Sequence, residues 1–61
     1  MGRDILAYID LDGYPIKTIY DQNIVDIPKE NQISENGEFR FVKSRKQYFG
    51  TVYIWRIIDK K

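Results

Sequence analysis

The sequence has no cysteine and no histidine. The absence of cysteine excludes disulfide bonds and a thiolate nucleophile, and the absence of both residues removes the side chains on which most structural zinc sites depend. Without histidine, the serine and threonine hydroxyls also lack the usual general base that would activate them. The carboxylates are scattered along the chain. The sequence therefore predicts a protein that is not an enzyme and that binds no metal ion and no cofactor.

Long apolar runs are absent as well, and none approaches the roughly 20 residues that a membrane-spanning helix needs. The first residues, Met1 to Asp4, lead directly into a strand-like segment and lack the basic and apolar regions of a signal peptide. We therefore expect a cytoplasmic protein that does not associate with a membrane.

Length is a further limit, because the chain has only 61 residues. A domain of this size buries only about 60% of the surface that its unfolded chain exposes, so its core is thin. With no disulfide to compensate, stability must come from packing or from self-association. We expect one small β domain, residues 1–61, for which a homodimer is one expected state.

Residues that favour β-strands are abundant. Tyr48 to Ile58 consists mainly of aromatic and β-branched residues, interrupted by Gly50, and contains none of the Ala, Leu or Glu that favour a helix. No segment of the chain shows a sustained helical period. The sequence predicts an all-β fold with strands at five places, namely 4–11, 14–20, 23–27, 38–43 and 47–58.

The pair Asp12-Gly13 predicts the turn of a first hairpin, because a type I′ turn needs positive φ at both central residues. Centring the turn there places Ala7 opposite Thr18 and Tyr8 opposite Lys17. One face of this hairpin is then apolar and the other largely polar, as in an antiparallel pair with one buried face. We expect the face that carries Ala7 to be in the core.

The segment Ser44 to Gln47 predicts the turn of a second hairpin, which places Phe41 opposite Gly50 and Phe39 opposite Val52. The small Gly50 then marks a site of bending or close packing. The predicted architecture is a small antiparallel five-stranded barrel or sandwich of the SH3-like or OB-like kind. Its predicted core comprises Ile5, Ala7, Ile9, Ile16, Phe39, Phe41, Val52 and Ile54.

Charge is unevenly distributed along the chain, although the net charge is only +1. Residues 1–39 carry three basic and eight acidic side chains, whereas residues 40–61 carry seven basic side chains and one acidic side chain. A fold that keeps the two parts separate would have one acidic and one basic surface. A basic surface of this kind suits an anionic partner.

Aromatic residues accompany these cations in the C-terminal hairpin. Flat rings beside cations are typical of surfaces that bind single-stranded nucleic acid, since rings stack on bases and cations contact phosphates. We therefore predict a non-catalytic binding domain that binds nucleic acid through this hairpin. The predicted binding residues are Arg40, Lys43, Arg45, Lys46, Phe49, Tyr53, Trp55 and Arg56.

Two alternatives stay open from the sequence. One is a small protein-protein interaction module or inhibitor, which docks on an acidic protein surface through the same aromatic face or through a strand edge. The other is that the rings of Phe49, Tyr53 and Trp55 bind no separate partner and instead complete a second small core or a dimer interface, with the lysines and arginines as a solvated rim.

Overall fold

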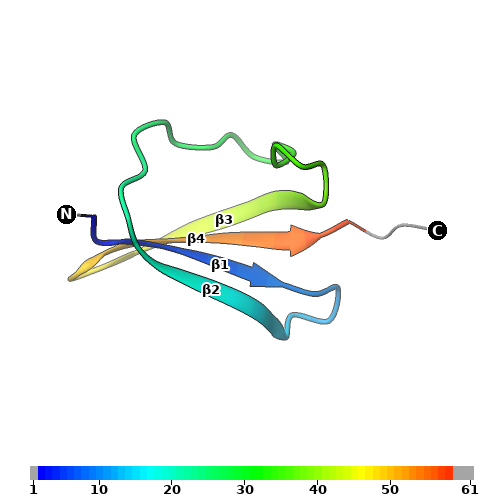
Figure 1. Ribbon diagram of the computed structural model, residues 1–61, viewed down its shortest axis with the longest axis horizontal. Coiled ribbons are helices and arrows are strands. Elements are labelled where there is room, and N and C mark those ends of the chain that lie inside the picture. Colours follow the sequence, from blue (N-terminus) through cyan, green and yellow to red (C-terminus); the bar gives the residue numbers. More distant parts are fainter. Residues whose placement is uncertain (1, 59–61) are drawn as a thin grey trace.

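The computed structural model describes residues 2–58, which form four strands and no helix. The strands are β1 (Asp4–Ile9), β2 (Pro15–Gln22), β3 (Phe39–Gln47) and β4 (Gly50–Ile57). They make one sheet in the order β2-β1-β4-β3 (Figure 1). Each hairpin is antiparallel, but the two central strands, β1 and β4, are parallel. The all-β class is confirmed. The five-stranded antiparallel barrel or sandwich is wrong, because the sheet has four strands, is mixed and does not close.

The first hairpin has the predicted register in its middle, with Ala7 opposite Thr18 and Tyr8 opposite Lys17. The register shifts on both sides of this stretch, where Ile9 pairs with Pro15 and Asp4 pairs with Gln22. Its turn lies at the predicted place but is not of type I′. Gly13 has a positive φ, at 92°, whereas Asp12 does not. The Asp10 carboxylate accepts hydrogen bonds from the backbone N–H groups of Asp12 and Tyr14, both at 2.9 Å. A side chain that binds its own turn in this way is a common substitute for backbone pairing.

The second hairpin differs from the prediction in its turn and register. β3 continues through Ser44 to Gln47, so the turn lies at Tyr48 and Phe49. Phe41 faces Trp55 instead of Gly50, and a bulge interrupts the pairing after Phe41. Side chains along a strand alternate between the two faces of the sheet. A register shift by an odd number of residues therefore pairs each residue with positions of the partner strand that were predicted to lie on the opposite face. The polar character of Ser44 to Gln47 reflects an exposed edge strand and not a turn.

The core lies on one face of the sheet, where four aromatic residues are buried: Phe39, Phe41, Tyr53 and Trp55. Leu6, Tyr8, Ile24 and Ile57 pack against them. The predicted core is therefore correct for Phe39 and Phe41 only. Ile16 is 47% exposed. The remaining predicted core residues are half-buried on the opposite face of the sheet, and they are Ile5, Ala7, Ile9, Val52 and Ile54.

The long segment between β2 and β3 covers the core face. Ile24 packs against the core, and its N–H donates to the Asp4 carboxylate at 2.9 Å. Further on, Ser34 donates its N–H to the Phe39 carbonyl at 2.8 Å, and the segment borders the outer edge of β3 (Figure 1). The strand predicted at 23–27 is wrong, because this stretch pairs with no strand and exposes Val25.

Gly50 allows a close approach between the start of β4 and the residue before β1. A Cβ atom at Gly50 would overlap the carbonyl oxygen of Arg3, and the backbone there has a φ of 156°. Gly50 faces Gln47 across the hairpin and not Phe41. Its small size therefore lets the parallel β1–β4 pair form.

Residues 2–58 form no helix that could span a membrane.

Candidate functional site

The candidate site is the face of the sheet that lies opposite the buried aromatic core, which we call the open face. Neighbouring residues along a strand point to opposite faces, and directly paired residues share a face. Because the segment between β2 and β3 lies over the core face, only turns and chain ends among residues 2–58 can border the open face. By register it comprises Ile5, Ala7, Ile9, Thr18, Arg40, Lys43, Arg45, Val52, Ile54 and Arg56.

The centre of the open face is aliphatic. Ile5 pairs with Val52, and Ala7 pairs with Ile54, on the two central strands. Ile9 extends this group along β1, and all five side chains are half-buried by their neighbours in the sheet. A sheet that is apolar on both faces normally has a second layer on each of them. Residues 2–58 provide such a layer on the core face only.

A basic row borders the aliphatic centre on the β3 side. It consists of Arg40, Lys43 and Arg45 on β3 and Arg56 on β4, and all four side chains are exposed. Arg40 lies directly opposite Arg56, an arrangement that is destabilising for two like charges. These two arginines also border a depression of about 300 Å³. An anion bound there would relieve their repulsion.

Lys46 and Phe49 have different positions from the rest of the predicted site. Lys46 pairs with Thr51 whereas Arg45 pairs with Val52, so Lys46 is on the core side of the sheet. Phe49 is a half-buried turn residue whose ring meets Tyr48 edge-on at 5.5 Å. It borders a second depression at the end of the open face, beside Ile5 and Tyr20.

Tyr53 and Trp55 are core residues and form no exposed stacking surface. They are only 3% and 8% exposed. Phe41 meets the Trp55 ring edge-on with 5.3 Å between centroids, and it also contacts Tyr53. Of the eight residues predicted to bind a partner, the structure brings Arg40, Lys43, Arg45 and Arg56 together, with Phe49 at one end of the same face.

The sequence prediction missed the aliphatic centre because it assigned these residues to the core. The signal that could have revealed them is the double-sided apolar pattern of β1 and β4. Leu6 and Tyr8 already serve the core face of β1, so Ile5 and Ala7 must face the other way. Residues 2–58 supply a covering segment for one face of the sheet only.

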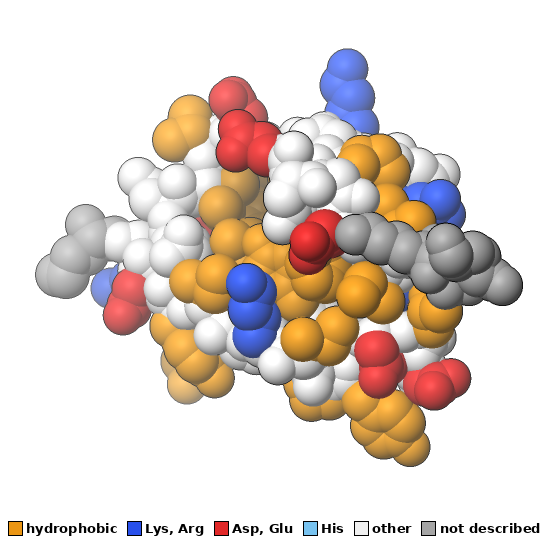
Figure 2. Space-filling view, turned by 45° about the vertical axis from the view of Figure 1, so that its right-hand side comes forward, with side chains coloured by type: hydrophobic (Ala, Val, Ile, Leu, Met, Phe, Trp, Pro, Cys, Tyr) orange, Lys and Arg blue, Asp and Glu red, His pale blue; other side chains and the backbone are white. Residues whose placement is uncertain are grey.

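Hydrophobic side chains also reach the surface elsewhere. In a view turned by 45° from that of Figure 1, they form a broad area with charged side chains at its margins and over it (Figure 2). Among the large exposed ones are Leu11, Tyr14 and Tyr20, at or near the first hairpin. This surface is consistent with a thin core.

Two of the acidic side chains are occupied by hydrogen bonds from backbone N–H groups. The Asp10 carboxylate is occupied by the turn, and the Asp4 carboxylate accepts from Ile24 and Thr51. Within residues 2–58, no three carboxylates come close enough together to hold a metal ion.

Comparison of the chain with known protein families, with curated proteins and with solved structures found no match.

Proposed function

We propose that the protein is a non-catalytic binding domain whose open face binds an acidic protein surface. The observation that carries the proposal is the aliphatic centre bordered by the basic row. Protein interfaces commonly combine an apolar centre with a polar rim, and a sheet face of this composition has the same plan. The fitting partner is an amphipathic segment with an apolar stripe and carboxylates along one side.

The aliphatic centre favours a protein partner over nucleic acid. Single-stranded nucleic acids bind sheets through rings that stack on their bases, and the centre of the open face carries isoleucine, valine and alanine. Tyr53 and Trp55, which the nucleic-acid hypothesis requires at the surface, are in the core.

Nucleic acid is the second candidate, and the basic row favours it. Four exposed cations on one side of a sheet, with Phe49 at its end, are able to follow a phosphate backbone. The salt dependence separates the two partners. Binding to a single strand weakens with a logarithmic slope of about 0.7 per phosphate contact, whereas an apolar protein interface changes little.

The decisive experiment compares two neighbouring cations. Arg45→Glu and Lys46→Glu make the same change of charge at adjacent exposed positions, but on opposite faces of the sheet. Immobilised parent and variant domains are used to capture proteins from the source lysate after nuclease treatment. We expect Arg45→Glu to lose the captured protein and Lys46→Glu to retain it.

The aliphatic centre is tested separately with Val52→Thr, which keeps the β-branched shape and adds a hydroxyl to the face. We expect weaker capture at every salt concentration. Capture that disappears with nuclease, together with salt-dependent binding of fluorescent single strands, would support the nucleic-acid candidate instead. Equal behaviour of Arg45→Glu and Lys46→Glu would contradict both candidates.

A further inference from the structure

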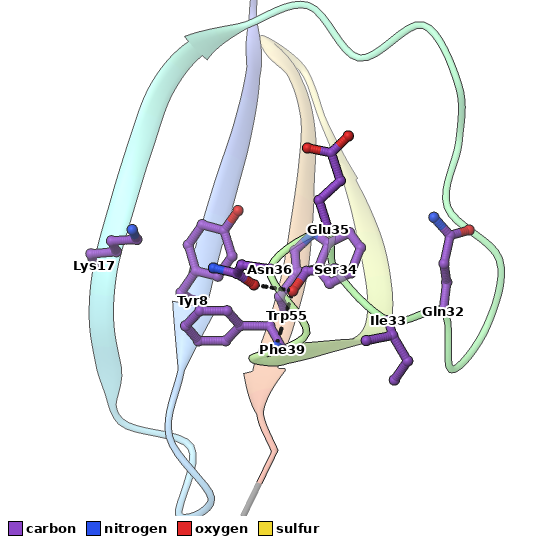
Figure 3. Close-up of a pocket in the computed structure, with 9 residues that line it drawn as sticks. All are labelled: Tyr8, Lys17, Gln32, Ile33, Ser34, Glu35, Asn36, Phe39 and Trp55. Atoms are coloured by element: carbon purple, nitrogen blue, oxygen red, sulfur yellow. Dashed lines mark hydrogen bonds between the residues drawn. The ribbon is translucent and has the colours of Figure 1, made fainter.

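A cavity of about 400 Å³ lies on the core face, between the sheet and the segment that covers it. Each strand contributes one lining residue, namely Tyr8 on β1, Lys17 on β2, Phe39 on β3 and Trp55 on β4 (Figure 3). Residues 32–36 of the covering segment form the rest of the wall. Cavities that bind small molecules commonly have volumes of about 300 to 1,000 Å³. The cavity is on the opposite side of the sheet from the open face, so it is independent of the proposed function.

The indole N–H of Trp55 is a buried donor without an acceptor. Trp55 lines the cavity and is only 8% exposed, and its Nε1 atom has no hydrogen-bond partner among residues 2–58. Nearly all buried polar groups in proteins are paired, so an exception of this kind calls for an explanation. An acceptor atom of a bound ligand supplies one.

The other polar groups around the cavity are mainly donors. The Lys17 ammonium lies 5.2 Å from the centroid of the Tyr8 ring, and its side chain reaches from β2 toward that ring (Figure 3). The Asn36 Oδ1 atom accepts from the Ser34 hydroxyl and from the N–H of Glu38, which leaves the Asn36 amide N–H groups for other partners. The Glu35 carboxylate points away from Lys17 (Figure 3).

We propose that this cavity binds a small organic carboxylate. The carboxylate accepts a hydrogen bond from the Trp55 N–H. It pairs with the Lys17 ammonium after this side chain turns from its place over the Tyr8 ring, because Tyr8 lies between Lys17 and Trp55 in the sheet. The apolar part of the ligand lies against the rings of Tyr8 and Phe39. These two rings are already in contact, with 4.5 Å between centroids, and so form a ready apolar wall. Because the Trp55 nitrogen is buried, the ligand reaches it only when the cavity wall, which includes residues 32–36, opens.

The single tryptophan makes the test direct, because the chain gives only one indole N–H signal in a proton–nitrogen NMR spectrum. Benzoate, benzamide and benzylammonium serve as probes, since they share a ring and differ in charge. We expect benzoate to bind most tightly and to move the Trp55 indole proton to higher chemical shift. The backbone signals of residues 34–36 should move with it.

Lysine variants identify the cation. Lys17→Gln should weaken benzoate binding at least tenfold, and Lys17→Arg should largely restore it, because the arginine keeps the charge. Lys29→Gln is the matched control. Lys29 is an exposed lysine on the segment that covers the core face, and it does not line the cavity. It should leave binding unchanged.

Three results would overturn the proposal. The first is benzylammonium or benzamide binding as tightly as benzoate. The second is an indole signal that no probe moves at concentrations on the order of ten millimolar. The third is an equal loss of binding in Lys17→Gln and Lys29→Gln, since this would assign the effect to overall charge.

Discussion

Trp55 and Tyr48 are aromatic residues of the same hairpin in opposite environments, one 8% and the other 98% exposed. Replacing a buried aromatic ring with alanine costs about 3 to 5 kcal/mol of the free energy of unfolding. Small domains have little more than that in total, so Trp55→Ala should be largely unfolded. Tyr48→Ala should change the free energy of unfolding by less than about 0.5 kcal/mol. Far-UV circular dichroism during urea unfolding measures both, and a folded Trp55→Ala domain would contradict the core assignment.

Tyr8 gives the molecule a pH dependence at alkaline pH. Burial raises the pKa of the Tyr8 phenol above its ordinary value of 10.0. Above about pH 10 the unfolded chain therefore releases this proton before the folded chain does, and the free energy of unfolding falls until the pH passes the folded-state pKa. Below pH 10 this contribution is constant.

Two phenylalanine variants isolate this contribution from that of the other groups that titrate at high pH. Tyr8→Phe should lose less stability between pH 9 and pH 11 than the parent domain, whereas Tyr48→Phe should follow the parent. Urea unfolding at a series of pH values provides the comparison. Identical pH profiles of Tyr8→Phe and the parent would contradict the prediction.

At the scale of elements, Asp4 links three parts of the chain. Its carboxylate belongs to β1 and accepts from Ile24, on the covering segment, at 2.9 Å and from Thr51, on β4, at 3.2 Å. Asp4→Asn keeps one acceptor oxygen and places an NH₂ group where the other oxygen was. Leaving a half-buried N–H without its acceptor costs about 1 to 3 kcal/mol. We expect a loss of that size for Asp4→Asn in thermal or urea unfolding.

Asp26 supplies the control, since it is an exposed carboxylate of the same covering segment. Asp26→Asn should leave the unfolding midpoint within experimental error of the parent. Should both variants lose the same stability, the effect would come from overall charge and not from the Asp4 hydrogen bonds.

The two hairpins show which elements the sequence could specify. The first hairpin follows from Asp12-Gly13 and from local pairing, so its position and its register from Leu6 to Tyr8 were predictable, whereas the register shifts on both sides of that stretch were not. In the second, the polar run Ser44 to Gln47 fits a turn and an exposed edge strand equally well, and only the tertiary position of β3 decides between them. The parallel pairing of β1 and β4 is likewise non-local and leaves no signature in either strand.

The candidate site was predictable in its charges but not in its centre. The basic residues of the C-terminal hairpin stand out in the sequence, and four of them share one face. The choice of which apolar face is buried depends on where the segment between β2 and β3 lies. That segment carries Ile24 to the core face, and nothing in its local sequence fixes this side.

At the scale of the whole molecule, the segment between β2 and β3 covers one apolar face of the sheet, and residues 2–58 leave the other apolar face uncovered. The domain on its own should self-associate through the open face at high concentration, because stacking two such faces removes aliphatic surface from water. Sedimentation at about 100 μM should therefore detect dimers. A strictly monomeric mass at that concentration would contradict the prediction.

Two lysine substitutions locate the contact. Ile54→Lys puts a charge in the centre of the open face and should abolish the dimer. Val25→Lys makes a similar change at a side chain that is 80% exposed on the covering segment, and it should leave the dimer intact. Association that depends on Val25 and not on Ile54 would place the interface elsewhere.

The central position of β4 also determines when the chain is able to fold during its synthesis. β4 is the last of the four described strands to be made, yet it lies between β1 and β3, and its contacts with β1 join residues 47 positions apart. All four buried core residues belong to β3 and β4. A nascent chain that ends before Gly50 therefore has β1, β2 and β3, but it lacks the strand that joins β1 to β3 and the core residues Tyr53 and Trp55. Folding of this sheet must wait until β4 has left the ribosome, and contacts of such long sequence separation form slowly.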